Sequence, residues 1–308
     1  MANIRPLNDG LRKKAKEELN EVESRIPDDI EALRSWIAKQ AHLKARTDDQ
    51  ILVSFLRGCK YSLEKAKSKI DYFYTIKTLM PEVFANKKID EKITDICRSG
   101  AYVCLPNSLG PDGPGIHFTN ISRLDQNKYN VTDLFRYEVM LMEMNLREDD
   151  NNVISGYLEV VDLTKLSIGF IAKLDVLLIK KILVFAEKGS PMRLKGVHLV
   201  NCPKEAQAIF IFIRSLMSEK IKQRFFIHKN LDELYQHMPK EYLPIEYGGT
   251  NGNIPDIQAE TEKNLIKFSD YFIDDDNYGV NEKLRVGRKI DSQILFGIEG
   301  SFRKLEID

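Results

Sequence analysis

The segment from Pro203 to Glu219 constrains the fold most, because it is apolar on more than one side. As a helix it carries one continuous stripe, made of Ala206, Ile209, Phe210, Ile213, Leu216 and Met217. Ile211 and Phe212 add apolar surface outside that stripe. A surface helix has a polar back, so the pattern predicts a buried helix, or a helix with one face on a core and another on a ligand. A strand is the other alternative, because Ile-Phe-Ile-Phe-Ile has high β-propensity.

Basic residues lie at both ends of this apolar segment. Arg193 and Lys195 are two apart, so they share a face of a strand. Lys220 and Arg224 are four apart, so they share a face of a helical turn. Four such cations suit a polyanionic lipid headgroup. The alternative is a solvated surface on which nearby acids, such as Glu205 and Glu219, balance the charge.

The rhythm of the chain changes from helical to mixed. Residues 8–90 have helical spacing throughout and predict a small bundle. After Asp95, strands alternate with helices, which predicts an α/β layer with a mostly parallel sheet. The expected strands are Ala101–Leu105, Gly115–Thr119, Gly156–Asp162, Lys195–Asn201 and Arg224–His228. The expected helices are 132–148, one long helix Ile168–Glu187, the segment that starts at Pro203, and Leu231–Met238.

Two further regions complete this outline. The glycine-rich stretch 110–115 lacks the spacing and the lysine of a phosphate-binding loop, so we expect a hairpin turn. Residues 251–308 are polar and turn-rich, with one helix candidate at Gln258–Phe272 and an extended end at Ser301–Ile307. The expected domains are a helical lobe at 1–90, an α/β domain at 91–250 and a C-terminal extension at 251–308.

Glu159 stands out within the strand Gly156–Asp162. Alternation along the strand puts it on the same face as Tyr157 and Val161. A carboxylate on the wall of an apolar pocket is costly unless it is paired, and burial raises its pKa. Two interpretations stay open: Glu159 holds the polar end of a ligand, or it pairs with a neighbouring cation or meets water at the sheet edge.

Composition and motifs exclude several classes of protein. The formal net charge is zero, which argues against a general nucleic-acid binder. No catalytic elbow appears, and the five histidines lack metal-ligand spacing, so we expect neither an enzyme nor a metal site. The most apolar helical window contains lysines and an aspartate and is too charged to span a bilayer. With unpatterned cysteines and no apolar signal core near Met1, we expect a cytoplasmic protein.

At this point the sequence resembles the CRAL-TRIO lipid-binding family. Phe55-Leu-Arg57 and the following Lys60–Ala66 are similar to the N-terminal helical motif of that family. Successive blocks of its lipid-binding domain resemble Tyr157–Asp162, Arg193–Pro203, Ser218–Arg224 and Leu243–Gly249, in family order. The resemblance covers about residues 30–250. It is strongest to the branch of α-tocopherol transfer protein and cellular retinaldehyde-binding protein, and the sequence looks like that of an invertebrate member.

The resemblance implies a fold and a set of site residues. The fold is a helical N-terminal lobe followed by an α/β lipid-binding domain with a deep apolar cavity and a mobile lid helix. Arg193, Lys195, Lys220 and Arg224 match the family's phosphoinositide-binding positions. Arg57 matches its Phe-Leu-Arg motif, whereas Cys59 replaces the second basic residue of that motif. The matching lipid-binding positions are Tyr157, Val161, Phe185, Val197, Ile209, Phe210, Ile213 and Met217, to which we add Glu159.

The expected function is the cytosolic binding and intermembrane transfer of one hydrophobic lipid, such as a retinoid, a tocopherol-like molecule or another isoprenoid. The basic residues would dock the protein on phosphoinositide-containing membranes, so the protein would be peripherally membrane-associated. We expect a monomer that has no cofactor beyond the bound lipid and does not bind nucleic acid. The alternative is a phosphoinositide-sensing adaptor that does not transfer lipid.

Overall fold

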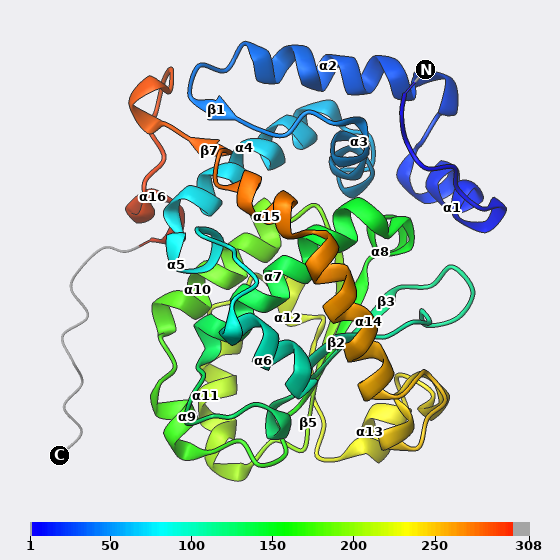
Figure 1. Ribbon diagram of the computed structural model, residues 1–308, viewed down its shortest axis with the longest axis vertical. Coiled ribbons are helices and arrows are strands. Elements are labelled where there is room, and N and C mark those ends of the chain that lie inside the picture. The colour runs from blue at the N-terminus through cyan, green and yellow to red at the C-terminus, as the bar shows by residue number, and fades with distance from the viewer. Residues whose placement is uncertain (1, 298–308) are drawn as a thin grey trace.

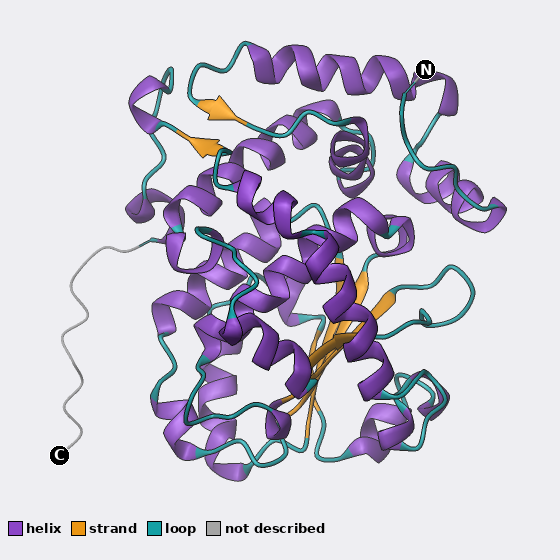
Figure 2. Cartoon of the chain, viewed as in Figure 1, coloured by secondary structure: helices purple, strands orange, loops and turns teal. Residues whose placement is uncertain are grey.

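The computed structural model describes residues 2–297, so the expected extended end at Ser301–Ile307 lies outside the described residues. Helices form most of the molecule and surround one central sheet (Figures 1 and 2). The N-terminal lobe contains α1 (Asp9–Leu19), α2 (Ile26–Ala38), α3 (Asp49–Gly58), α4 (Leu63–Leu79) and α5 (Pro81–Phe84). Buried apolar residues at helical spacing, such as Ile30, Leu33 and Ile37, explain why this region forms a bundle.

The central sheet has five strands in the order β2-β3-β4-β5-β6. These are β2 (Tyr102–Cys104), β3 (Gly115–Asn120), β4 (Tyr157–Asp162), β5 (Leu194–Val200) and β6 (Phe225–Ile227). β2 and β3 form an antiparallel hairpin around the glycine-rich stretch 110–115, and the other pairs are parallel. The predicted strands, the hairpin and the mostly parallel sheet are therefore confirmed.

The parallel strands follow one another across the sheet in chain order. Right-handed crossovers between successive neighbours then place every connecting helix on the same face of the sheet. The connecting helices are α7 (Val131–Glu148), α8 (Asp150–Ser155), α9 (Ile168–Ala172), α10 (Val176–Val184), α11 (Lys204–Ser215) and α12 (Glu219–Lys222). Helix α6 (Glu91–Ser99) precedes the sheet and packs against α7. The opposite face packs on residues around α13 (Leu231–Tyr235), among them Leu234, Met238 and Leu243.

The expected single helix Ile168–Glu187 is wrong. The Ser167 hydroxyl accepts from the Phe170 amide at the start of α9, and the Asp175 carboxylate accepts from the Leu177 amide to begin α10. A five-residue π-helix, Phe185–Gly189, then follows α10. Asp175 is thus a cap rather than a surface charge within a continuous helix, and the turn at Lys173 and Leu174, between α9 and α10, interrupts the segment.

The C-terminal extension braces the other two regions. The predicted helix at Gln258–Phe272 is instead two helices, α14 (Ile254–Lys267) and α15 (Ser269–Asp275), separated at Phe268. They run diagonally across the molecule toward β7 (Gly279–Val280), which pairs antiparallel with β1 (Leu43–Lys44) of the N-terminal lobe (Figure 1). A last helix, α16 (Ser292–Phe296), packs Leu295 and Phe296 into the core of that lobe.

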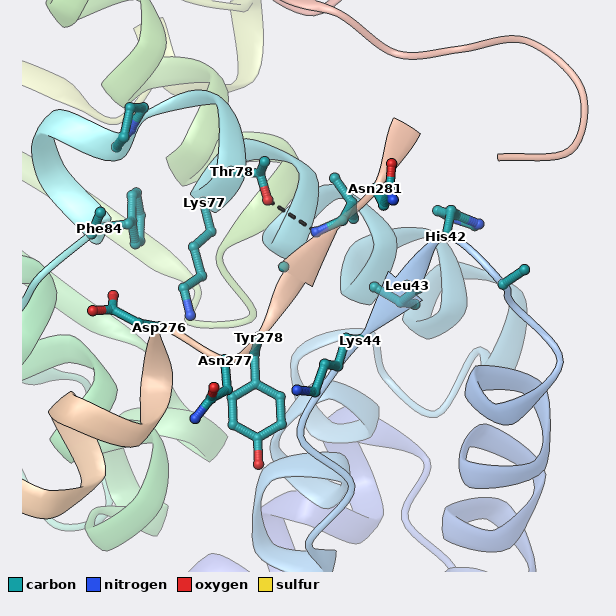
Figure 3. Close-up of a pocket in the computed structure, with 15 residues that line it drawn as sticks. His42, Leu43, Lys44, Lys77, Thr78, Phe84, Asp276, Asn277, Tyr278 and Asn281 are labelled. Atoms are coloured by element: carbon teal, nitrogen blue, oxygen red, sulfur yellow. Dashed lines mark hydrogen bonds between the residues drawn. The ribbon is translucent and has the colours of Figure 1, made fainter. Parts of the chain in front are cut away.

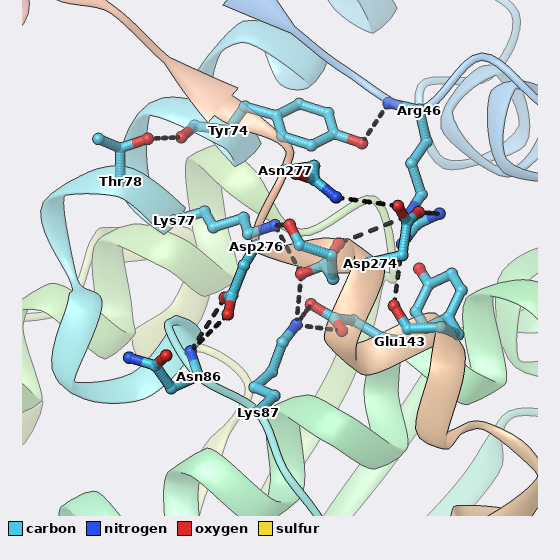
Figure 4. Close-up of polar contacts among 12 residues, drawn as sticks. Arg46, Tyr74, Lys77, Thr78, Asn86, Lys87, Glu143, Asp274, Asp276 and Asn277 are labelled. Carbon is cyan, nitrogen blue, oxygen red and sulfur yellow. Dashed lines mark hydrogen bonds and ion pairs between the residues drawn. The ribbon is translucent and has the colours of Figure 1, made fainter.

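A buried ion cluster fixes this extension in place (Figure 4). The Lys87 ammonium contacts the carboxylate of Glu143 on α7 and lies 2.7 Å from Asp275 Oδ2 on α15. Lys77 of α4 lies 2.5 Å from the same Asp275 oxygen. Cations and acids from three separate regions therefore neutralise one another away from water. These contacts cross both of the predicted domain boundaries, at residues 90 and 250, so they do not divide the chain there. The boundaries stay a prediction.

Candidate lipid cavity and basic groove

An apolar cavity of about 340 Å³ lies between the sheet and its crossover helices. This volume falls in the range of about 300–1,000 Å³ that is usual for small-molecule sites. Alternation along β4 turns Tyr157, Glu159 and Val161 toward the cavity, whereas Leu158 and Val160 point into the opposite side of the sheet. Apolar residues of α7, α10 and the π-helix, such as Phe135, Ile182 and Phe185, form the other walls.

The structure places most of the predicted lipid-binding residues around this cavity. Its lining includes Tyr157, Glu159, Val161, Phe185, Val197, Phe210, Ile213 and Met217. Ile209 is half-buried and does not line the cavity, because it lies at the edge of the helical face that carries Phe210 and Ile213. The arrangement brings residues from β4, β5, the π-helix and α11 to one site. Their role in binding a lipid stays a prediction.

Helix α11 covers the cavity without being buried itself. Phe210 and Ile213 line the cavity, whereas Ile211 and Phe212 are 64% and 46% exposed. Within α11, all of which the structure describes, Ala206 is the one fully buried residue. A helix with one apolar face on a cavity and another in solvent agrees with neither full burial nor a strand. The second apolar face, expected to contact protein or ligand, instead faces outward.

Two carboxyl groups, Glu138 on α7 and Glu159 on β4, line this largely apolar cavity. The Thr119 hydroxyl donates to Glu159 Oε1 at 2.9 Å, and His117 Nδ1 lies 4.0 Å from Glu159 Oε2. Burial raises the pKa of Glu159 well above its usual value, and the nearby charge of Glu138 raises it further. Burial also raises the pKa of Glu138 to about 8 and lowers the pKa of His117 to about 4. At neutral pH this corner of the cavity therefore carries little charge.

Glu138 was not among the residues predicted from sequence. Val131, Phe135, Glu138 and Met142 lie three or four apart in α7, so they share one face of the helix, and all four line the cavity. A carboxyl group in the middle of an apolar stripe is the signal that would have identified it. Its meaning depends on knowing that this stripe faces a cavity rather than a packed core.

The four predicted basic residues lie together in a separate groove of about 800 Å³. Its lining contains eight basic side chains and three acidic ones, Glu18, Glu64 and Glu187. The basic ones are Lys60, Lys65, Lys69, Lys188, Arg193, Lys195, Lys220 and Arg224. Prediction from sequence placed most of the docking charge in residues 193–224. The structure adds Lys65 and Lys69 of α4, which a linear motif does not reveal because they are distant in sequence.

Several of these cations are oriented by the backbone. Arg224 donates to the Leu194 carbonyl at 2.5 Å, and Arg193 donates to the Ile154 carbonyl. Lys69 donates to the carbonyl of Ser190 at 2.9 Å, just after the π-helix. Burial lowers the pKa of Arg193 and Lys195, and their mutual repulsion adds to the shift of Lys195. None of the four predicted cations pairs with an acid within residues 2–297 at ion-pair distance.

The groove and the cavity share a wall. Ala186, Ser190, Met192, Leu194 and Ile221 line both of them. The predicted headgroup site and the predicted lipid site are therefore neighbours, separated by the end of the π-helix and the start of β5.

Arg57 of the Phe-Leu-Arg motif points away from the groove into the interior. Its guanidinium lies 2.8 Å from Glu21 Oε2 and 2.7 Å from Asp150 Oδ1, and its side chain is 1% exposed. Since Glu21 follows α1 and Asp150 begins α8, this arginine joins the two lobes. Its environment is that of a structural ion pair.

A further hollow, of about 450 Å³, lies at the seam between the N-terminal lobe and the extension (Figure 3). Lys44, Lys77, Asp276 and Tyr278 surround it, and the Thr78 hydroxyl accepts from the Val280 amide at 3.0 Å on its edge. It shares no described lining residue with the apolar cavity.

Two kinds of feature are absent from residues 2–297. No cluster of histidine, cysteine and acidic residues in this range suits a metal ion. No helix in this range is long and apolar enough to cross a membrane.

Comparison with known proteins decides the family. Residues 99–249 match the CRAL/TRIO domain, and residues 22–94 match a Pinta-like UBA domain. The chain is 31% identical to the human alpha-tocopherol transfer protein-like protein over 252 residues, which cover 80% of this chain and 72% of the relative. The chain belongs to the CRAL-TRIO family. The resemblance of the sequence motifs is thereby confirmed, and CRAL-TRIO proteins bind and transfer small lipophilic molecules.

Two other similarities extend this result. Rat clavesin-1 is 27% identical over 265 residues, which cover 85% of this chain and 74% of clavesin-1. The crystal structure of Sfh5 superposes with a TM-score of 0.50 at 15% identity, covering 85% of this chain and 99% of Sfh5. At that identity the likeness shows the CRAL-TRIO fold alone. The helical N-terminal region and the mostly parallel sheet are features that this fold shares.

Proposed function

We propose that this protein binds one hydrophobic lipid, such as a retinoid, a tocopherol-like molecule or another isoprenoid, and transfers it between membranes. The observation that carries this proposal is the apolar cavity of about 340 Å³ covered by α11. Apolar surface of the lipid that is buried there leaves water at a gain of roughly 25 cal/mol per Å². The protein acts in the cytoplasm as a peripheral, monomeric carrier, and it leaves the lipid chemically unchanged.

Phosphoinositide-dependent docking is the second part of the proposal. The excess of basic side chains in the groove attracts anionic headgroups, and the backbone contacts of Arg193 and Arg224 preorganise their guanidinium groups. Because the groove and the cavity share the wall at Ser190–Leu194, a headgroup bound in one can alter the other. The membrane then favours the open position of α11, because it binds the protein more tightly in the open state than in the closed state.

Native mass spectrometry of the purified protein tests lipid binding. We expect a single lipid to be retained at one per chain and to be released to acceptor liposomes without chemical change. A chain that carries no lipid but still binds phosphoinositide liposomes would support the alternative of an adaptor without transfer activity. Conversion of the lipid during incubation would contradict the non-enzymatic part of the proposal.

Liposome sedimentation tests docking. The double variant Arg193→Ala/Lys220→Ala removes two groove cations, and we expect at least about tenfold weaker binding to phosphoinositide liposomes. Lys263→Ala/Lys267→Ala is the matched control, because it removes the same charge from the exposed face of α14. Equal binding by the groove variant and the control variant would show that net charge, rather than the groove, attracts the membrane.

A further inference from the structure

The central strand of the sheet carries an acid where an apolar residue is expected. Glu159 is the third residue of β4, and β4 lies in the middle of the five-stranded sheet. Its neighbours in register are His117 on β3 and Val197 on β5. This position excludes the interpretation that Glu159 meets water at a sheet edge. A carboxyl group is retained at the floor of an apolar cavity despite the cost of burial.

A second carboxyl group faces the same cavity from the opposite wall. Glu138 of α7 lines it, and no hydrogen bond or ion pair of Glu138 occurs within residues 2–297. Glu159 has one described hydrogen-bond donor, the Thr119 hydroxyl. His117 is engaged elsewhere, because its Nδ1 lies 2.8 Å from the Tyr102 hydroxyl. The two acids therefore keep hydrogen-bonding capacity that the protein itself leaves unused.

We propose that Glu138 and Glu159 form the polar end of the cavity and select lipids with an uncharged oxygen head, an alcohol or a carbonyl, over lipid carboxylates. This inference rests on the proposed lipid-binding function and narrows its ligand class. The groups that face the pair from the surrounding elements are Thr119 and His117 on β3, Tyr102 on β2 and Tyr157 on β4. None of them supplies a positive charge to a ligand carboxylate at neutral pH, since His117 is neutral there.

The chemistry of the pair explains the selection. A protonated carboxyl group donates one hydrogen bond and still accepts others, so it satisfies either an alcohol or a carbonyl oxygen. A ligand carboxylate would add a third acid to a cavity that already holds two, in surroundings that penalise every added negative charge. The direction of the pKa shifts of Glu138 and Glu159 supports this view, because both groups favour the neutral form.

Matched lipid pairs test the inference. Delipidated protein is incubated at pH 7 with farnesol and farnesoic acid, retinol and retinoic acid, or hexadecanol and hexadecanoic acid, and the bound lipids are extracted and quantified. We expect the alcohol of each bound pair to exceed the acid by about tenfold, the effect of one hydrogen bond that is gained or lost. This ratio is measured on the unaltered chain and does not depend on the folding of a variant.

Two variants test whether the alcohol-to-acid ratio depends on Glu138 and Glu159. In Glu138→Gln/Glu159→Gln the amide groups donate to a carboxylate without adding acids, so we expect the alcohol-to-acid ratio to fall to within about threefold. Glu260→Gln on the exposed face of α14 is the matched control and should keep the original ratio. An unchanged ratio in the folded double variant would overturn the assignment.

The outcomes separate this inference from the function on which it rests. If the unaltered chain binds none of these lipids, lipid binding itself fails, and the selection fails with it. If it binds alcohols and acids equally, lipid binding stands and the selection alone is lost. Retention of hexadecylamine in preference to hexadecanol would also overturn the inference, because the pair would then act as an anionic site.

Discussion

At the scale of single residues, Arg57 shows how a family motif can serve the architecture. A guanidinium that is 1% exposed and bonded to Glu21 and Asp150 is an ion pair that holds two lobes together. Arg57→Ala leaves the buried carboxylate of Glu21 without a cation and leaves Asp150 with Arg5 alone, so we expect the free energy of unfolding to fall by about 3–5 kcal/mol in urea titrations. The control Arg98→Ala removes an arginine that is 65% exposed and should cost less than about 1 kcal/mol.

The buried acids of the cavity predict an unusual dependence of stability on pH. The pKa of Glu138 is raised from 4.5 to about 8, so between these values the folded chain keeps a proton that the unfolded chain releases. This contribution to stability is complete below pH 4.5 and is lost as the pH rises toward 8, by up to about 1.4 kcal/mol per pH unit for one group. Urea titrations at pH 5, 6.5 and 8 measure it against Glu138→Gln/Glu159→Gln, which should gain on the unaltered chain as the pH rises. Parallel profiles would contradict this.

At the scale of elements, α11 presents apolar side chains to two environments. Phe210 and Ile213 line the cavity, while Ile211 and Phe212 are exposed to solvent. A helix of this kind can insert its outer face into a membrane interface. We expect Ile211→Ser/Phe212→Ser to bind liposomes at least about tenfold more weakly while retaining its lipid, since two buried apolar side chains contribute a few kcal/mol.

Surface apolarity elsewhere supplies the control for α11. Ile266 and Ile273, on α14 and α15, are 60% and 57% exposed and lie in the C-terminal extension. Ile266→Ser/Ile273→Ser removes comparable apolar surface, so its liposome binding should match that of the unaltered chain. A similar loss in both double variants would mean that the effect is general rather than a property of α11.

Elements with a clear period were predictable, and their junctions were not. The largely apolar run Gly156–Asp162 predicted β4, and the face on which strand geometry placed Tyr157, Glu159 and Val161 is the one that lines the cavity. The break before α10 was missed because Asp175 serves as a cap, which depends on local backbone geometry that hydrophobic periodicity does not encode. Glu138 and Lys69 were missed for another reason: each acquires its meaning from elements that are distant in sequence.

At the scale of the whole molecule, the C-terminal extension closes the structure. Asp275 at the end of α15 forms ion pairs with Lys77 of α4 and with Lys87, which also contacts Glu143 of α7. Lys87 is 0% exposed, and its ammonium group contacts the carboxylates of both Glu143 and Asp275. One carboxylate thereby joins the N-terminal lobe, the helical layer over the cavity and the extension.

This arrangement predicts that a single charge in the extension controls global stability. Asp275→Asn leaves two buried lysines with one carboxylate between them, so we expect the free energy of unfolding to fall by about 3–5 kcal/mol in urea titrations. The adjacent Asp274 is 49% exposed and pairs with Arg46, so Asp274→Asn should cost no more than about 1 kcal/mol. Disruption of the buried ion cluster should also expose the α15–β7 connection to limited proteolysis in Asp275→Asn but not in Asp274→Asn. If the two variants are equally stable, the extension is held by its apolar contacts, among them the fully buried Phe272, and not by the ion cluster.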